Sequence, residues 1–194
     1  MQAPAALRIR PPEPADAETL LAFELANREW FETWVQPRDD AFYSLEGVHA
    51  AIAQSAQARR DDRGYHFLVL DGERLVGRVN LHGVRRSQHQ CAELGYRVAR
   101  AEAGRGVATA AAALCLAQAF GPLALWRVEA TAWPGNAGSI RVLERRGFRR
   151  FGHSRRSVRL HGQWRDLLHF ERHADDASPC PGADVRRGTS RSRH

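Results

Sequence analysis

The stretch Arg100–Phe120, RAEAGRGVATAAAALCLAQAF, places two glycines around an arginine directly before a run of helix-forming residues. Gly104 and Gly106 carry no side chains that could block a close approach, and the first amides of a helix have no partners within the helix. Such amides can point at phosphate oxygens. The plainer explanation is a strand-to-helix turn that needs glycine, and a short glycine motif on its own favours it. The rest of the chain has to decide between the two explanations.

Composition predicts one globular domain. The chain has 194 residues, of which 43% are hydrophobic and 26% are charged, and this is enough for a single domain with a core but hardly for two. No apolar run approaches the roughly 20 residues that span a membrane, and the first residues lack the basic start and apolar centre of a signal peptide. We therefore expect a cytoplasmic protein that does not bind membranes.

The cysteines and the net charge limit the kinds of site and partner that the sequence predicts. Cys91, Cys115 and Cys180 are scattered without a CxxC motif or a Cys/His cluster, so the sequence predicts neither a disulfide framework nor a metal site. The formal net charge of +7 comes entirely from arginine, because the sequence contains no lysine. A basic surface attracts anions such as nucleotides, RNA or acidic proteins. An RNA- or ribosome-binding protein is therefore one hypothesis, whereas DNA binding is not expected.

Hydrophobic periodicity and turn residues predict an α/β order of elements. Asn136 is expected to cap the start of the last helix, and Gly147 is expected to end it. From His173 onward the chain is small, polar and unpatterned, so we expect a domain over residues 1–172 and a disordered tail over 173–194. The expected elements are, in chain order, strand 6–10, helices 15–30 and 45–60, strands 65–70, 74–81 and 91–98, helix 107–120, strand 125–133, helix 137–146, and strands 149–160 and 163–172.

In this order the motifs resemble the GNAT N-acetyltransferase superfamily and, more narrowly, its RimJ/RimL group of ribosomal-protein N-terminal acetyltransferases. The resemblance runs from about Leu7 to Glu171 and rests on three segments: NREWFETWVQPRDD, ELGYRV followed by GRGVAT, and RVEATAWPGNAGSIRVLERRGF with GQWRDLLHF. It implies a GNAT fold, in which a mixed, mostly antiparallel sheet of about seven strands is flanked by helices and splayed at the acetyl-CoA site. A monomer or a homodimer is compatible with it.

The resemblance also implies an activity. Such an enzyme uses acetyl-CoA as co-substrate, without a metal, and acetylates a primary amine by direct attack in a ternary complex. The implied acceptor is the N-terminal amine of a protein, with a ribosomal protein and association with the ribosome as the narrower expectation. A small-molecule amine or antibiotic acetyltransferase is the alternative enzyme, because a fold does not name a substrate. A non-catalytic RNA- or ribosome-binding protein is the alternative from another class.

Two segments are implied to hold the co-substrate. In the family the glycine-rich loop wraps the pyrophosphate of acetyl-CoA, and the strand ELGYRV holds the pantetheine and acetyl group. An amide near Val98 could there stabilise the oxyanion that forms when an amine attacks the thioester. Ala103 departs from the family pattern, which has Gln or Arg at this position, and Arg105 and the backbone are expected to compensate. The implied binding residues in these segments are Tyr96, Arg97, Val98, Gly104, Arg105, Gly106, Val107, Ala108 and Thr109.

Glu93 is the candidate general base. By the alternation of a strand it lies on the face opposite Leu94 and Tyr96, where a carboxylate could take a proton from the attacking ammonium directly or through water. A solvated charge on a strand face is the alternative explanation. Glu29 and Glu32 are the other candidate acids, because they lie in the segment that resembles the substrate wall.

Ser139 is the candidate proton donor for the departing thiolate. Many GNAT enzymes use a tyrosine at the position of Leu143, which cannot serve. Asn136 and Ser139 match the Asn-x-x-Ser of the RimJ/RimL group, so Ser139 is implied beside the sulfur and Asn136 on the pantetheine arm. Capping of the helix start explains Asn136 equally well, and Ser139 less well.

The acceptor side departs from the family pattern. Related enzymes often have a tyrosine or an acid in the strand before the GxW turn, where this chain has Ser157, Val158 and His161, so substrate recognition is expected to differ. Aromatic residues of the substrate-side segment could line an acceptor groove, although some of them are expected in the core. These residues are Trp30, Trp34, Phe42 and Tyr43.

Overall fold

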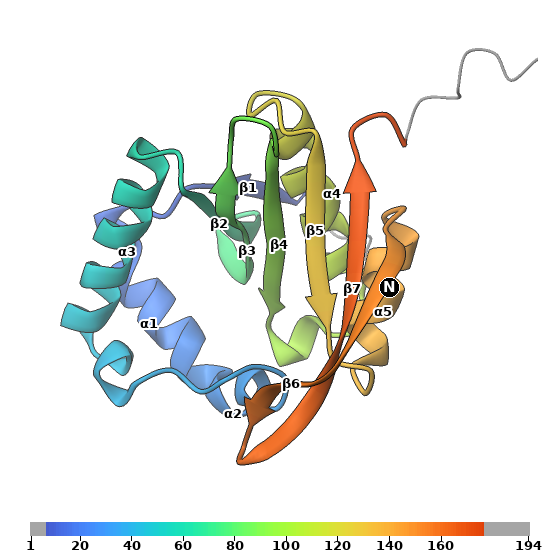
Figure 1. Cartoon of the computed structure of the whole chain (residues 1–194). Coiled ribbons are helices and arrows are strands. Elements are labelled where there is room, and N and C mark those ends of the chain that lie inside the picture. The colour runs from blue at the N-terminus through green and yellow to red at the C-terminus, as the bar shows by residue number, and fades with distance from the viewer. Residues whose placement is uncertain (1–6, 177–194) are drawn as a thin grey trace, which may run out of the picture.

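A seven-stranded mixed sheet organises the chain. The computed structural model describes residues 7–176. Its strand order is β1-β2-β3-β4-β5-β7-β6, and only the β4–β5 pair is parallel, so the expected mixed, mostly antiparallel sheet is confirmed (Figure 1). The strands are β1 Arg8–Arg10, β2 Gly64–Asp71, β3 Arg74–Arg85, β4 Cys91–Val98, β5 Arg127–Ala132, β6 Arg149–Leu160 and β7 Gln163–His173.

The long helices begin and end close to the predicted residues, except for the first one. One helix was expected over 15–30, but the chain breaks it at Asn27. The Asn27 side chain donates from Nδ2 to the Phe23 carbonyl over 2.9 Å and accepts the backbone N–H of Arg100 over 2.9 Å, which stabilises the break and ties it to the end of β4. The helices are α1 Ala17–Ala26, α2 Arg28–Glu32, α3 Leu45–Arg60, α4 Val107–Phe120 and α5 Ala137–Arg145, with short 3-10 turns η1 Pro14–Asp16, η2 Asp40–Tyr43 and η3 Arg100–Glu102.

Two apolar layers cover the two faces of the sheet. Side chains of a strand alternate between faces, so Val69 of β2 packs in the cluster under α4, whereas Leu68 and Leu70 pack in the cluster formed with α1 and α3. Figure 1 shows α1 and α3 together on one side, apart from α4 and α5. Because both faces of β2 are covered, its sequence FLVL is continuously apolar.

The sheet opens between β4 and β5. These strands pair only where Cys91–Glu93 lie beside Arg127–Glu129. From Leu94 onward β4 has no neighbour on this edge, while β5 continues along β7 as far as Ala132. The expected splay of the sheet is therefore present.

The sheet extends one residue past the expected domain boundary. His173 is the last residue of β7, and the next residue, Ala174, donates its N–H to the Trp126 carbonyl over 2.9 Å. Residues 174–176 form a turn. The part of the expected tail from 177 to 194 lies outside the described residues.

Candidate active site

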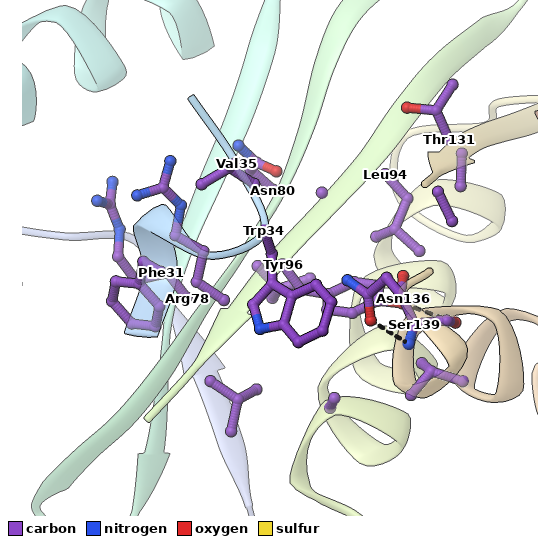
Figure 2. A pocket seen from close by; sticks show the side chains of 18 of the residues that line it. Phe31, Trp34, Val35, Arg78, Asn80, Leu94, Tyr96, Thr131, Asn136 and Ser139 are labelled. Atoms are coloured by element: carbon purple, nitrogen blue, oxygen red, sulfur yellow. Dashed lines mark hydrogen bonds between the residues drawn. The ribbon is translucent and has the colours of Figure 1, made fainter. Parts of the chain in front are cut away.

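A cavity of about 1230 Å³ lies in the splay. Residues of α2, β3, β4, α5 and the N-terminus of α4 line it. Figure 2 shows Arg78 and Phe31 at one end in this view, Asn136 and Ser139 at the other, and Trp34 between them. The segments that the sequence pointed to, far apart along the chain, thus meet at one cavity.

The glycine turn leaves the start of α4 open. Gly104 and Gly106 have φ angles of +77° and +83°, and a Cβ at either position would meet nothing within 4 Å. The first helical bond runs from the Ala110 N–H to the Gly106 carbonyl, so the N–H groups of Val107, Ala108 and Thr109 have no partners in the helix. The first turn contains no acidic residue. This open, positively polarised helix start fits a pyrophosphate.

Glu102 fixes the base of the glycine turn, a role that the sequence did not reveal. Its carboxylate is 4% exposed and accepts from Arg74 over 2.6 Å. Arg105 lies 3.2 Å from the same carboxylate, with 59% of its side chain exposed. In this arrangement Arg105 is paired with Glu102, so an anion in the turn would meet the backbone amides first.

The free edge of β4 faces the splay with its backbone. The N–H of Ala99 donates to the Val76 carbonyl of β3, so by alternation the backbone groups of Leu94, Tyr96 and Val98 face the gap. The Val98 carbonyl accepts from Trp30 Nε1 over 3.1 Å. Arg97 is a predicted co-substrate residue. Its side chain points to the face of the sheet that α1 covers, opposite to Leu94 and Tyr96, and lies 3.8 Å from Glu24 of α1.

Tyr96 and Ser139 form a hydroxyl pair beside the gap. The Tyr96 hydroxyl lies 2.9 Å from Ser139 Oγ, and burial raises the pKa of Tyr96 to about 12, so this phenol is protonated at neutral pH. Asn136 caps α5, as predicted, by accepting the N–H of Ser139 over 3.0 Å. Leu143 is buried in the core with 1% exposure and offers no hydroxyl, whereas Ser139 and Tyr96 both place one at the cavity.

Glu93 lines the cavity and is ionised. It accepts from Thr131 Oγ1 over 2.9 Å, and His82 Nε2 lies 3.5 Å from its other oxygen. The hydrogen bonds from His82 and then Thr131 hold the pKa of Glu93 below its usual value, against the opposing effect of burial. Glu93 is therefore a carboxylate at neutral pH, able to attract an ammonium group and take a proton from it.

The other candidate acids lie elsewhere. Glu32 accepts from Arg28 over 2.9 Å and from the Tyr43 hydroxyl over 3.4 Å. Among the residues that the structure describes, neither Glu29 nor Glu32 lines the cavity, whereas Glu93 does. The geometry therefore favours Glu93 among the three acids.

Tryptophans form one wall of the cavity. The Trp34 ring packs against Trp30 and Trp133, with centroid distances of 5.9 Å and 5.8 Å. Phe42 and Tyr43, the other two aromatics expected in an acceptor groove, instead lie under Arg38 and Arg28, each guanidinium 4.1 Å from the ring centre. Trp30 and Trp34 line the cavity, whereas Phe42 and Tyr43 do not; Phe42 packs against the apolar cluster under α1 and α3, in line with the expectation that some of the four aromatics lie in the core.

The β6–β7 hairpin meets the helical side of the cavity. His161 in its turn lies with Nε2 2.6 Å from the Glu32 carbonyl, and Val158 of β6 lines the cavity. Arg165 of β7 stacks over Trp133 at 4.8 Å. Of the three residues Ser157, Val158 and His161, His161 thus joins the hairpin to α2, and Val158 contributes to the cavity lining.

Residues 7–176 contain neither a metal-binding cluster nor a membrane-spanning helix. No group of three or more His, Cys, Asp or Glu side chains there could hold a metal ion. No helix in the same range combines the length and apolarity needed to cross a membrane.

Comparison with known proteins identifies the family. A family model described as an acetyltransferase (GNAT) domain matches residues 6–149. A protein named probable N-acetyltransferase YjcK, from Bacillus subtilis, is 38% identical over 160 residues, which are 81% of this chain and 88% of that protein. The ribosomal protein uS5-alanine N-acetyltransferase of Escherichia coli is 24% identical over 153 residues, 78% of this chain and 79% of that protein.

A solved structure agrees with these sequence relatives. RimJ of Mycobacterium smegmatis, in complex with CoA-disulfide, superposes with a TM-score of 0.86 and 28% identity over 91% of this chain and 86% of that one. The expected GNAT fold is therefore confirmed. The chain belongs to the GNAT family and is an N-acetyltransferase related to the RimJ/RimL ribosomal-protein acetyltransferases.

Proposed function

We propose that this chain binds acetyl-CoA in the splay and acetylates the N-terminal amine of a protein, with a ribosomal protein as the narrower candidate. One observation carries the proposal: the glycine turn, the free edge of β4, the Tyr96–Ser139 pair and Glu93 all border the same cavity. Binding, proton removal and proton donation can therefore take place at one site.

The residues at the splay fit acetyl-CoA. The two glycines leave space over unpartnered amides of α4, which suits the pyrophosphate. The backbone groups on the free edge of β4 can pair with the amides of an extended pantetheine arm, and Asn136 keeps its Nδ2 for the same arm while its oxygen caps α5. When bound, acetyl-CoA supplies a thioester carbonyl carbon that an amine can attack.

Different side chains of the chain then remove a proton from the amine and donate a proton to the leaving sulfur. Glu93 is ionised and takes a proton from the ammonium of the acceptor, because only the neutral amine is nucleophilic. N–H groups on the free edge of β4 face the place where negative charge develops on oxygen. Ser139 donates a proton toward the sulfur, and the neighbouring Tyr96 hydroxyl, held 2.9 Å away, orients it and can replace the proton.

The relatives support a protein acceptor. The Escherichia coli relative is named for acetylating an alanine of ribosomal protein uS5, and its sequence aligns with 78% of this chain and 79% of its own length. The formal net charge of +7 is consistent with a ribosomal acceptor, because an arginine-rich surface is attracted to RNA. Such an enzyme works in the cytoplasm and associates with ribosomes transiently.

A parallel acceptor screen tests the proposal. The full chain is incubated with acetyl-CoA and, separately, with peptides bearing free N-termini, with polyamines and with aminoglycosides, while released CoA thiol is measured. We expect turnover with peptides and a mass increase of one acetyl group on the α-amine. Turnover confined to polyamines or aminoglycosides would assign a small-molecule acceptor instead, and salt-sensitive RNA binding without acetyl-CoA binding would assign a non-catalytic protein.

A further inference from the structure

Three arginines meet around a single buried carboxylate at one end of the cavity. Glu24 of α1 is 0% exposed and accepts a hydrogen bond from Arg78 of β3. Arg97 of β4 lies 3.8 Å from its other oxygen. Arg38, in the connection after α2, lines the same cavity. The four residues are called the cation cluster below, and their formal charges sum to two positive charges.

The cation cluster is not neutralised by its own members. Arg78 and Arg97 lie directly opposite each other on adjacent strands, where like charges destabilise a sheet. Burial and the positive charges of Arg97 and Arg78 lower the pKa of Arg38 to about 10. Arg38 Nε and Glu24 Oε2 are buried and have no hydrogen-bond partner within residues 7–176. The cluster therefore has spare donors and too little negative charge.

The other acidic residues nearby do not neutralise the excess positive charge of the cation cluster. The Glu32 carboxylate is already bound by Arg28 and by the Tyr43 hydroxyl. Glu93 lies on the same face of β4 as Arg97 but four residues along the strand, which is about 13 Å at the usual rise per residue. An anion in the cavity would be the nearest additional partner for the cluster.

The sheet face between the cluster and Glu93 is uncharged. Asn80 and Gly95 form the middle row of cross-strand pairs, between Arg78 with Arg97 and His82 with Glu93. A Cβ on Gly95 would lie 2.5 Å from Asn80 Oδ1, so a larger residue there would displace this amide from its present position. Asn80 Oδ1 is buried without a partner in the described chain. The cavity floor thus has a positive end, a neutral middle with one free hydrogen-bond acceptor, and a negative end.

We propose that the cation cluster binds a carboxylate of the acceptor while the acceptor's amine lies at the Asn80–Glu93 end. The middle row is roughly 7 Å from the cluster and the Glu93 row roughly 13 Å. An extended peptide covers about 3.4 Å per residue, so an aspartate or glutamate side chain within the first three residues reaches the arginines. The proposal rests on the proposed function, since it takes the acceptor to be an amine delivered into this cavity.

Matched peptides test the proposal with the full-length enzyme. Two pairs of octapeptides differ only by Asp or Asn, at the second or at the third residue, and the ratio of their kcat/KM values is measured with acetyl-CoA saturating. Charged hydrogen bonds are the strong ones, so we expect the acidic peptide of at least one pair to be preferred by about tenfold or more. Equal kcat/KM values in both pairs would overturn the proposal without needing any variant.

Two arginine variants show whether the preference for acidic peptides depends on the cation cluster. Arg38→Gln removes the arginine of the cluster that is not paired with Glu24, and it should reduce the acidic preference to about twofold or less while the KM for acetyl-CoA is unchanged. Arg165→Gln removes the same charge from another part of the cavity lining, where Arg165 stacks over Trp133, and should keep the preference. Loss of the preference in Arg165→Gln and not in Arg38→Gln would place the carboxylate elsewhere. Thermal melts check that both variants are folded.

A third set of substrates shows whether the bound carboxylate belongs to a side chain or to a C-terminus. It also distinguishes a failure of the cation-cluster proposal from a failure of the proposed protein-acceptor function. Dipeptides with a free or amidated C-terminus and free amino acids are assayed beside the octapeptides. If peptides are acetylated without an acidic preference, the cation cluster has no role in selection and the proposed function stands. If only small carboxylate-bearing amines are acetylated, and Arg38→Gln weakens this activity, the cluster binds its carboxylate and the protein-acceptor function is wrong.

Discussion

The two halves of the cavity are built in different ways. The half proposed to hold acetyl-CoA, called the donor half, consists of the glycine turn and the first turns of α4 and α5, and it is made mostly of backbone groups and small residues that are close in the sequence. The half proposed to hold the acceptor, called the acceptor half, is made of charged and aromatic side chains that come from α1, α2, β3 and β4. Backbone sites depend on local conformation, whereas the side-chain site depends on the whole fold. The two halves should therefore respond differently to mutation.

The largest effect is expected where backbone meets phosphate. Gly106→Val places a side chain in the space above the α4 amides, where a Cβ now meets no other atom. We expect a loss of CoA affinity of roughly a hundredfold or more, about 2.7 kcal/mol, measured by calorimetry. Gly72→Val is the control, because Gly72 also has a positive φ of +60° with open space around it, but lies in the β2–β3 turn. Unchanged CoA affinity in folded Gly106→Val would remove the phosphate site from this turn.

A smaller effect is expected at Ser139, the proposed proton donor. Ser139→Ala should lower the single-turnover rate by about tenfold to a hundredfold and leave CoA affinity intact, because the Asn136 cap uses the backbone N–H of residue 139. Tyr96→Phe should give a smaller loss, since it removes only the partner hydroxyl. Ser157→Ala, an exposed serine of β6, is the matched control. A full single-turnover rate in Ser139→Ala would reduce Ser139 to a helix-start residue.

The effect at Glu93 should depend on pH. The pKa of Glu93 is lowered, so the carboxylate is present throughout the neutral range and is lost only as pH falls below its usual titration range. Glu93→Gln should slow the reaction by about tenfold at pH 7, and the loss should shrink toward pH 9 as more of the amine, with a pKa of about 8, is already neutral. Rescue by Glu93→Asp would support proton transfer. Wild-type activity of Glu93→Gln at pH 7 would instead direct attention to Glu29 and Glu32.

The donor half could be predicted from the sequence because its signals are local. Glycine before a helix, Asn136 at a cap and Gly147 at a helix end each depend on a few neighbouring residues, and the structure shows the cap and the positive φ angles. The break at Asn27 was missed because one of the hydrogen bonds that stabilise it comes from Arg100, 73 residues away. Period alone predicts a continuous helix there.

The acceptor half could be predicted only in part. The alternation of β4 correctly separates Glu93 from Leu94 and Tyr96, but no local pattern indicates that Glu24, Arg38 and Arg78 meet. Each of them looks like a surface charge in the sequence, and a buried carboxylate in particular is rare without a partner. Only the register of β3 with β4 and the packing of α1 bring them together.

The smallest effect is expected from a change in salt concentration. The salt dependence of KM distinguishes attraction by the protein surface from binding by the buried cation cluster. Long-range attraction by the +7 surface is screened within about 10 Å at 0.1 M salt and about 3 Å at 1 M, whereas partly buried arginines are screened less. Raising salt from 50 to 500 mM should increase the KM of an acidic peptide about threefold with kcat nearly constant. The KM of the matched neutral peptide should change less. A KM for the acidic peptide that does not change with salt would show that surface charge plays no part in capture, and any remaining acidic preference would then belong to the buried arginines alone.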